Sequence, residues 1–115
     1  MNFIPGKFYI CSRIDDLLMS SGEVAFRAGA SYRATYEDRL CSEVAPTGHH
    51  LDCYSSSGER AEWLESFLAV EEDVLLDQLN SASHEKRISF CQRILNRLSE
   101  LRKARAEPIP NDFPF

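Results

Sequence analysis

The spacing of apolar residues changes once along the chain, and this change limits the fold more than any other feature. Over roughly the first seventy residues, short apolar or alternating runs recur at intervals of about ten, separated by turn residues, which is typical of a small antiparallel barrel or sandwich. From Glu71 onward, apolar residues are spaced three and four apart, as in a helix with one buried face. The sequence therefore predicts the α+β class, with the strands first and the helices last.

The expected strands are short segments with the residue types and the alternation of strands: 8–11, 24–26, 32–36, 40–45, 50–54 and 68–70. The turns between them include Ser20–Gly22 and Pro46–Gly48, because Ser, Pro and Gly favour reversals of the chain. Ser56 and Glu59 have the spacing of a capping box. We therefore expect a short helix that plugs one end of the barrel before the last strand.

Two antiparallel helices are expected next. The first begins near residues 71–73, because acidic side chains suit a helix N-terminus. Residues 80–83 indicate a break, with Ser83 as the N-cap of a second, longer helix. That helix is expected to bury one stripe, formed by Ile88, Cys91, Ile94, Leu95, Leu98 and Leu101. Pro108 ends the helical pattern.

The length of 115 residues and mass of 13.1 kDa suit a single compact domain. Within it we expect an SH3-like barrel over 1–70, a helical hairpin over 71–107 and a Pro/Phe tail over 108–115. The N-terminus lacks the order of a signal peptide, and no apolar run is long enough for a membrane span. The four cysteines are expected to be reduced thiols of a cytoplasmic protein.

Charge is distributed unevenly along the chain, whose net charge is -5. Residues 1–68 hold ten acidic and six basic side chains, and residues 69–83 add four acidic ones and no basic one. Residues 84–107 hold seven basic and three acidic side chains. An acidic barrel and first helix are therefore expected beside a basic second helix, and general coating of nucleic acid is disfavoured.

Three segments resemble small SH3-like barrel modules of phage, prophage and gut-bacterial proteins: Gly22–Tyr32, Pro46–His50 and Glu62–Leu64. In the first, Phe26, Gly29 and Tyr32 are spaced three apart, as at the turn into the second long strand of those modules. The resemblance covers about residues 7–70 and implies the barrel fold with an end-plug helix. It brings no catalytic residues with it.

No motif in the sequence indicates catalysis, a cofactor or a metal. Cys41, His49, His50 and Cys53 have the residue types of a zinc site but lack the C-x2-C spacing. His50 and Cys53 would also face opposite sides of a strand. A cysteine–histidine nucleophile would need an activating environment that the sequence does not show. We therefore expect no enzyme, no cofactor and no metal.

The leading hypothesis is a non-enzymatic protein-interaction module with another protein as its partner. Its concrete form is an anti-CRISPR-like accessory protein that inhibits a host nucleic-acid-processing or defence complex through acidic surfaces. The expected contact residues are charged residues of the helices and aromatic residues of the tail: Glu71, Glu72, Asp73, Asp77, Arg97, Arg102, Arg105, Phe113 and Phe115. The charged residues also suit solvated helix faces, and the two phenylalanines could equally pack back on the barrel.

The alternative hypothesis is direct nucleic-acid binding through the barrel face and the basic second helix. Aromatic side chains would stack on bases and arginines would hold phosphates: Phe8, Tyr9, Tyr32, Tyr36 and Tyr54 with Arg33, Arg97, Arg102 and Arg105. The apolar stripe of the second helix also allows a homodimer.

Overall fold

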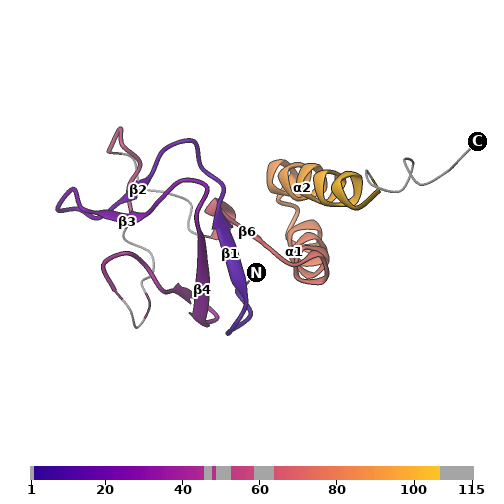
Figure 1. The fold of residues 1–115 in the computed structure, drawn as a ribbon, viewed down its shortest axis with the longest axis horizontal. Helices are drawn as coiled ribbons and strands as arrows, with labels where there is room; N and C mark the ends of the chain where they lie inside the picture. Colours follow the sequence, from indigo (N-terminus) through magenta and orange to yellow (C-terminus); the bar gives the residue numbers. More distant parts are fainter. Residues whose placement is uncertain (1, 46–47, 49–52, 59–63, 107–115) are drawn as a thin grey trace, which may run out of the picture.

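Strands come first and helices last in the computed structural model, which describes residues 2–45, 48, 53–58 and 64–106 (Figure 1). The elements are β1 (Phe8–Cys11), β2 (Leu17–Leu18), β3 (Val24–Phe26), β4 (Ser31–Tyr36), β5 (Arg39–Leu40), the 3-10 helix η1 (Leu64–Ser66), β6 (Phe67–Ala69), α1 (Glu72–His84) and α2 (Ile88–Ala106). This order confirms the α+β class.

The strands of the described residues form two separate antiparallel sheets rather than one closed barrel. The larger sheet has the order β5-β4-β1-β6, and the smaller one pairs β2 with β3. Tyr9 of β1 lies opposite Tyr32 of β4 on one side and Ala69 of β6 on the other. All three residues are buried, so the central strand β1 turns one face of the sheet toward the core.

The strands predicted over 8–11 and 24–26 are confirmed as β1 and β3. The strands predicted over 32–36 and 68–70 match β4 and β6 to within one residue. The strand predicted over 40–45 is wrong, because β5 ends at Leu40. The Ser42 hydroxyl accepts hydrogen bonds from the amides of Val44 and Ala45, and this local turn replaces the strand ladder. The strand β2 was not predicted, since two residues show no periodicity.

Most of the segment 50–54 and of the capping-box helix lies outside the described residues. At their described ends, Tyr54 forms a single bridge with Leu18, and the hydroxyl of Ser56 donates to the carboxylate of Asp15 at 3.0 Å. The 3-10 helix η1 stands where the resemblance implies a helical element before the last strand.

The two helices meet later in the chain than the spacing predicts. Ser83 lies inside α1 rather than capping α2, because Ala82 is buried in the core and α1 continues through it. Lys86 then adopts a positive φ of 58°. The amide of Lys86 donates to Ser83 O and that of Arg87 to Ala82 O, the pattern of a Schellman motif. This motif, not a break at 80–83, separates the helices.

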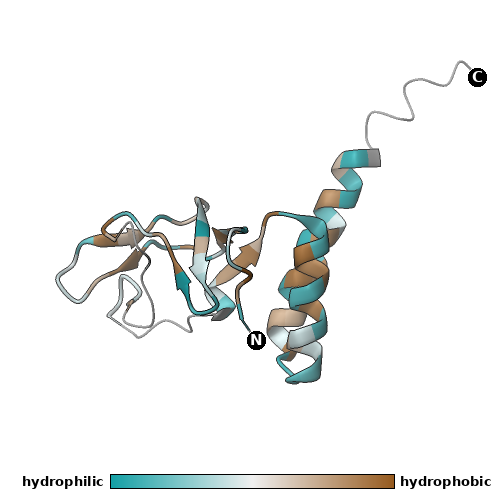
Figure 2. Cartoon of the chain, turned by 90° about the horizontal axis from the view of Figure 1, so that it is seen from below, coloured by the Kyte–Doolittle hydropathy of each residue, from teal (hydrophilic) through white to brown (hydrophobic). Residues whose placement is uncertain are grey.

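The helices and sheets share one continuous set of buried side chains. Phe26 and Phe67 pack with their ring centroids 5.0 Å apart, and Val74 and Leu75 of α1 belong to the same cluster. From α2 the cluster includes Phe90, Ile94 and Leu98. Both views place the two helices beside the strands, at one end of the sheets (Figures 1 and 2).

Only some of the residues in the apolar stripe predicted for α2 are buried. Ile94 and Leu98 are buried, and Cys91 and Leu101 are partly buried. Ile88 and Leu95, however, are 81% and 46% exposed, while Phe90 completes the buried stripe instead. Neither described helix is long and apolar enough to cross a lipid bilayer.

Candidate functional site

The acidic residues predicted to bind a partner do not form one free surface. Glu71, just before α1, forms an ion pair with Lys7 at 2.9 Å. The hydrogen bond with Glu71 raises the pKa of the Lys7 ammonium. The side chains are 40% and 52% exposed, so this contact is a solvent-screened surface pair.

Glu72 brings together predicted contact residues from both helices. Its carboxylate accepts from Nε of Arg102 at 3.0 Å and from both terminal nitrogens of Arg105 at 2.9 Å. The hydrogen bond from Arg102 lowers the pKa of the Glu72 carboxyl, and Arg105 acts in the same direction. The start of α1 is thereby joined to the end of α2, and these three residues are partners of one another.

Asp73 and Asp77 remain on the solvent side of α1. Both are exposed, and their spacing of four places them on one face of the helix. Neither forms an ion pair with any residue for which the structure gives a position, although Asp73 accepts a hydrogen bond from the amide of Val74. Leu76 lies between them and is also exposed. Two of the four predicted acidic residues are thus available to a partner.

The arginines of α2 point mainly toward the rest of the chain. Arg87, just before α2, contacts Glu65 at 3.3 Å and Glu85 at 3.2 Å. Arg93 donates to the carbonyl of Glu65 at 2.6 Å and to the hydroxyl of Ser12. Arg97 is only partly exposed and lies 3.9 Å from Glu100. The expected basic face is therefore not a continuous, free cationic surface.

Two aromatic residues assigned to base stacking by the nucleic-acid alternative are buried. Tyr9 and Tyr32 belong to the core, which corrects their assignment, whereas Phe8 and Tyr36 are exposed. The tail residues Phe113 and Phe115, like the turn residues His49 and His50, lie outside the described residues.

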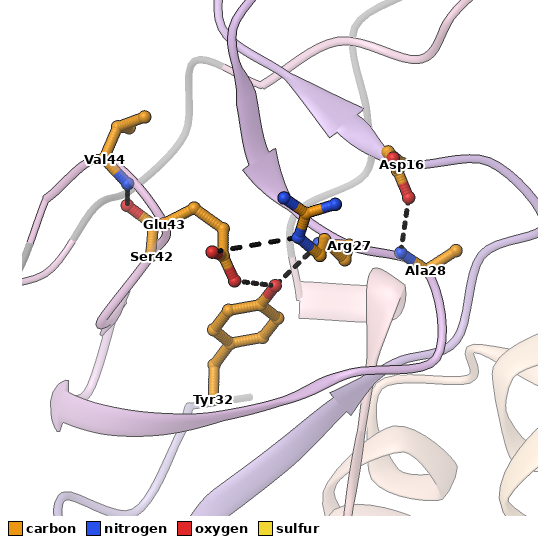
Figure 3. Close-up of polar contacts among 7 residues, drawn as sticks. All are labelled: Asp16, Arg27, Ala28, Tyr32, Ser42, Glu43 and Val44. Carbon is orange, nitrogen blue, oxygen red and sulfur yellow. Dashed lines mark hydrogen bonds and ion pairs between the residues drawn. The ribbon is translucent and has the colours of Figure 1, made fainter.

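Tyr32 is the centre of a polar network that fixes loops (Figure 3). Its hydroxyl accepts from the amide of Arg27 at 2.7 Å and donates to the carboxylate of Glu43 at 2.8 Å. Burial raises the pKa of the Tyr32 hydroxyl to about 12, and the contact with Glu43 acts in the same direction. The hydroxyl therefore remains protonated at neutral pH and acts as a structural donor.

The surroundings of Cys11 do not favour an activated nucleophile. The four cysteines form no disulfide, and Cys11 and Cys53 are buried. Burial raises the pKa of the Cys11 thiol, whereas a reactive cysteine needs a lowered pKa. Within the described ranges, no three histidine, cysteine or acidic side chains are grouped as metal ligands.

One surface was missed by the sequence analysis, and we call it the α2 outer face. Every exposed residue of α2 between Ile88 and Ser99 is uncharged: Ile88, Ser89, Gln92, Leu95, Asn96 and Ser99. Gln92 donates to Asn96 at 3.1 Å along this face. The stripe Phe90–Ile94–Leu98, with spacings of four, could have identified Ile88 and Leu95 as outward residues.

Comparisons of the chain with protein-family models, curated proteins and solved structures found no match.

Proposed function

We propose that the chain is a non-enzymatic protein-interaction module that contacts its partner through the α2 outer face. The observation that carries the proposal is the absence of charge among the exposed residues of α2 from Ile88 to Ser99. Ile88 and Leu95 supply exposed apolar side chains at a spacing of seven, on the same side of the helix.

Such a face is unusual for a helix that meets only solvent. The solvent side of a surface helix is ordinarily occupied by charged and polar residues, and 27% of this chain is charged. The centres of protein interfaces, in contrast, are depleted of charged residues and are more apolar than the rest of the surface. The composition of the α2 outer face therefore fits a protein partner.

A narrower proposal is that the partner is a host nucleic-acid-processing or defence complex, inhibited by an accessory protein of a phage. It is supported by the fourteen acidic and six basic side chains of residues 1–83 and by the exposed Asp73 and Asp77. These two carboxylates would steer the chain toward a basic groove. Replacement of both by Asn is expected to slow association and to reduce its salt dependence.

For the fold we propose the SH3-like class named by the resemblance. Two features support it. The larger sheet has four antiparallel strands, and the 3-10 helix η1 directly precedes the last of them in the chain, β6. Direct nucleic-acid binding is the less well supported function. Arg102 and Arg105 contact Glu72, and Tyr9 and Tyr32 are buried.

The proposal is tested by affinity capture with three baits from lysate of the organism that encodes the chain or of its host. The baits are the wild type, Leu95→Glu, and Val44→Glu as the matched control. Val44 is 39% exposed, close to the 46% of Leu95, but it follows β5. Sedimentation of the purified proteins identifies the case in which the partner is a second copy.

A charge at the centre of an interface is expected to weaken binding by at least about tenfold. The wild type and Val44→Glu should therefore capture the same protein, and Leu95→Glu should lose it. Equal capture by all three baits, or no partner and no self-association for the wild type, would contradict the proposal.

A further inference from the structure

Three apolar side chains lie together on one face of the larger sheet, opposite to the face that carries Tyr9. Tyr9 and Cys11 of β1 are fully buried, and because side chains alternate along a strand, Phe8 and Ile10 lie on the other face. Leu68 of β6 is the register partner of Ile10 and therefore lies beside it on that face. We call Phe8, Ile10 and Leu68 the sheet strip, of which Phe8 is 49% exposed.

The sheet strip continues into a hollow of about 270 Å³ between the larger sheet and helix α2. Ile10 and Leu68 line the hollow from the sheet, Arg97 lines it from α2, and its walls are mainly apolar. Pockets that hold drug-sized ligands are larger, at roughly 300–1,000 Å³. One large apolar side chain in the hollow, with its neighbours in sequence covering Phe8, therefore fits this surface better than a free small molecule does.

Arginines border this apolar surface. Among the described residues that line the hollow, the charged ones are Arg13 and Arg97. Arg33 of β4 is the register partner of Phe8 and is exposed, so a third guanidinium group lies beside the other end of the sheet strip. Glu100 lies 3.9 Å from Arg97 but is 71% exposed, and such contacts are weak and screened by solvent. The surface therefore favours a partner that carries negative charge.

The wall that carries Arg13 is held in place by polar contacts of the residues that follow it. The carboxylate of Asp15 accepts from the hydroxyl of Ser56 at 3.0 Å, and that of Asp16 accepts from the amide of Ala28 at 2.8 Å. Both carboxylates are thus used to fix the segment between β1 and β2. A wall that is already formed lowers the entropic cost of binding.

We propose that the hollow and the sheet strip bind an acidic segment of another protein, which places one large apolar side chain in the hollow. The apolar side chain displaces water from Ile10 and Leu68. Carboxylates on either side of it in the segment are attracted by the guanidinium groups of Arg13, Arg33 and Arg97. An apolar anchor in a small pocket is the usual centre of a protein interface, and charged residues at its rim select the partner.

The test is an NMR titration of the isotope-labelled full chain, at constant ionic strength, with three acetylated and amidated peptides. The first peptide is Asp-Glu-Ser-Phe-Ser-Glu-Asp, the second has Ala in place of Phe, and the third has Lys in place of each acidic residue. The first should shift the signals of Ile10, Leu68 and Arg97. It should also bind at least about tenfold more tightly than either of the others.

Variants of the chain test the sheet strip and the charge beside it separately. Phe8→Ala should weaken binding of the first peptide by about fivefold or more. Tyr36→Ala is the matched control, because it removes an exposed aromatic ring of the same sheet that lies outside the sheet strip. Arg33→Gln should weaken binding by about two- to fivefold, and Lys103→Gln, which removes an exposed charge near the end of α2, should weaken it less. Circular dichroism confirms that each variant is folded.

The proposal is overturned if the first peptide leaves the signals of Ile10, Leu68 and Arg97 unshifted, or binds no more tightly than the peptide with Ala or the peptide with Lys. Shifts of the same signals that depend on protein concentration without any peptide would also contradict it, because a second copy would then occupy the hollow. Leu95→Glu, on the α2 outer face, should leave peptide binding unchanged. Failure here is therefore distinct from failure of the proposed function.

Discussion

Gln78 is a polar side chain that lies almost entirely within the core. It is only 4% exposed, yet both the oxygen and the nitrogen of its side-chain amide are hydrogen-bonded. Its Oε1 accepts from the amide of Ala69 at 2.8 Å, and its Nε2 donates to the carbonyl of Phe67 at 3.2 Å. Since β6 is an edge strand, this side chain from α1 satisfies backbone groups that no neighbouring strand of the sheet reaches.

Replacement of Gln78 by Met should therefore be strongly destabilising. The variant keeps the length of the side chain but leaves two buried backbone groups without partners, which is expected to cost about 2–4 kcal/mol. Urea denaturation measures the change in the free energy of unfolding. Gln92→Met, on the exposed side of α2, should change it by less than about 0.5 kcal/mol. Similar values for both variants would contradict this role of Gln78.

The buried hydroxyl of Tyr32 leads to a prediction about alkaline pH. Its pKa is raised to about 12 in the folded chain, whereas a tyrosine in an unfolded chain has a pKa of about 10. The contribution of this group to stability is thus complete below about pH 10 and is lost as the pH rises toward about 12.

An absorbance titration of the folded protein should show this tyrosine ionising near pH 12. Burial also raises the pKa of Tyr9, so the alkaline step should lose one tyrosine in Tyr32→Phe and keep its full size in Tyr36→Phe, since Tyr36 is 59% exposed. An unchanged titration curve for Tyr32→Phe would show that the network around Glu43 does not hold the proton.

At the scale of elements, the contact of Glu72 with Arg102 and Arg105 connects the first turn of α1 to the last turns of α2. Arg102 lowers the pKa of the Glu72 carboxyl. The contribution of the contact is therefore present above the usual carboxyl pKa and is lost as the pH falls through the lowered value.

Amide hydrogen exchange should detect this contact at the end of α2. At neutral pH, Glu72→Gln should accelerate exchange at residues 102–105 and leave residues 94–98 unchanged, because the latter pack on the core. Glu100→Gln is the control, since Glu100 is mostly exposed. The difference between wild type and Glu72→Gln should vanish in acid, and its persistence there would contradict the assignment.

Among the elements, some can be predicted from the sequence and others cannot. The strand β1 was predicted correctly because Phe8–Cys11 is dense in aromatic and β-branched residues. The boundary between the helices was not, because Ser83 is a good N-cap in isolation while burial of Ala82 continues α1 past it. Tertiary packing here overrides a local signal.

At the scale of the whole molecule, charge counts predicted which charged side chains are free less well than the spacing of apolar residues predicted the fold class. Nothing in the sequence showed that Glu72 would meet Arg102 and Arg105, because that contact depends on how the helices pair. The α2 outer face was missed for the same reason. Ile88 and Leu95 also fit the spacing of core residues, and in the structure the competing stripe through Phe90 is the buried one.

The central claim is that this molecule acts by binding another protein through the α2 outer face. Site-specific photo-crosslinking tests it most directly, with a photoreactive side chain at position 95 in one sample and at position 44 in another. The account predicts a defined covalent adduct from position 95 and none from position 44. Adducts from both positions in equal yield, or from position 44 alone, would contradict it.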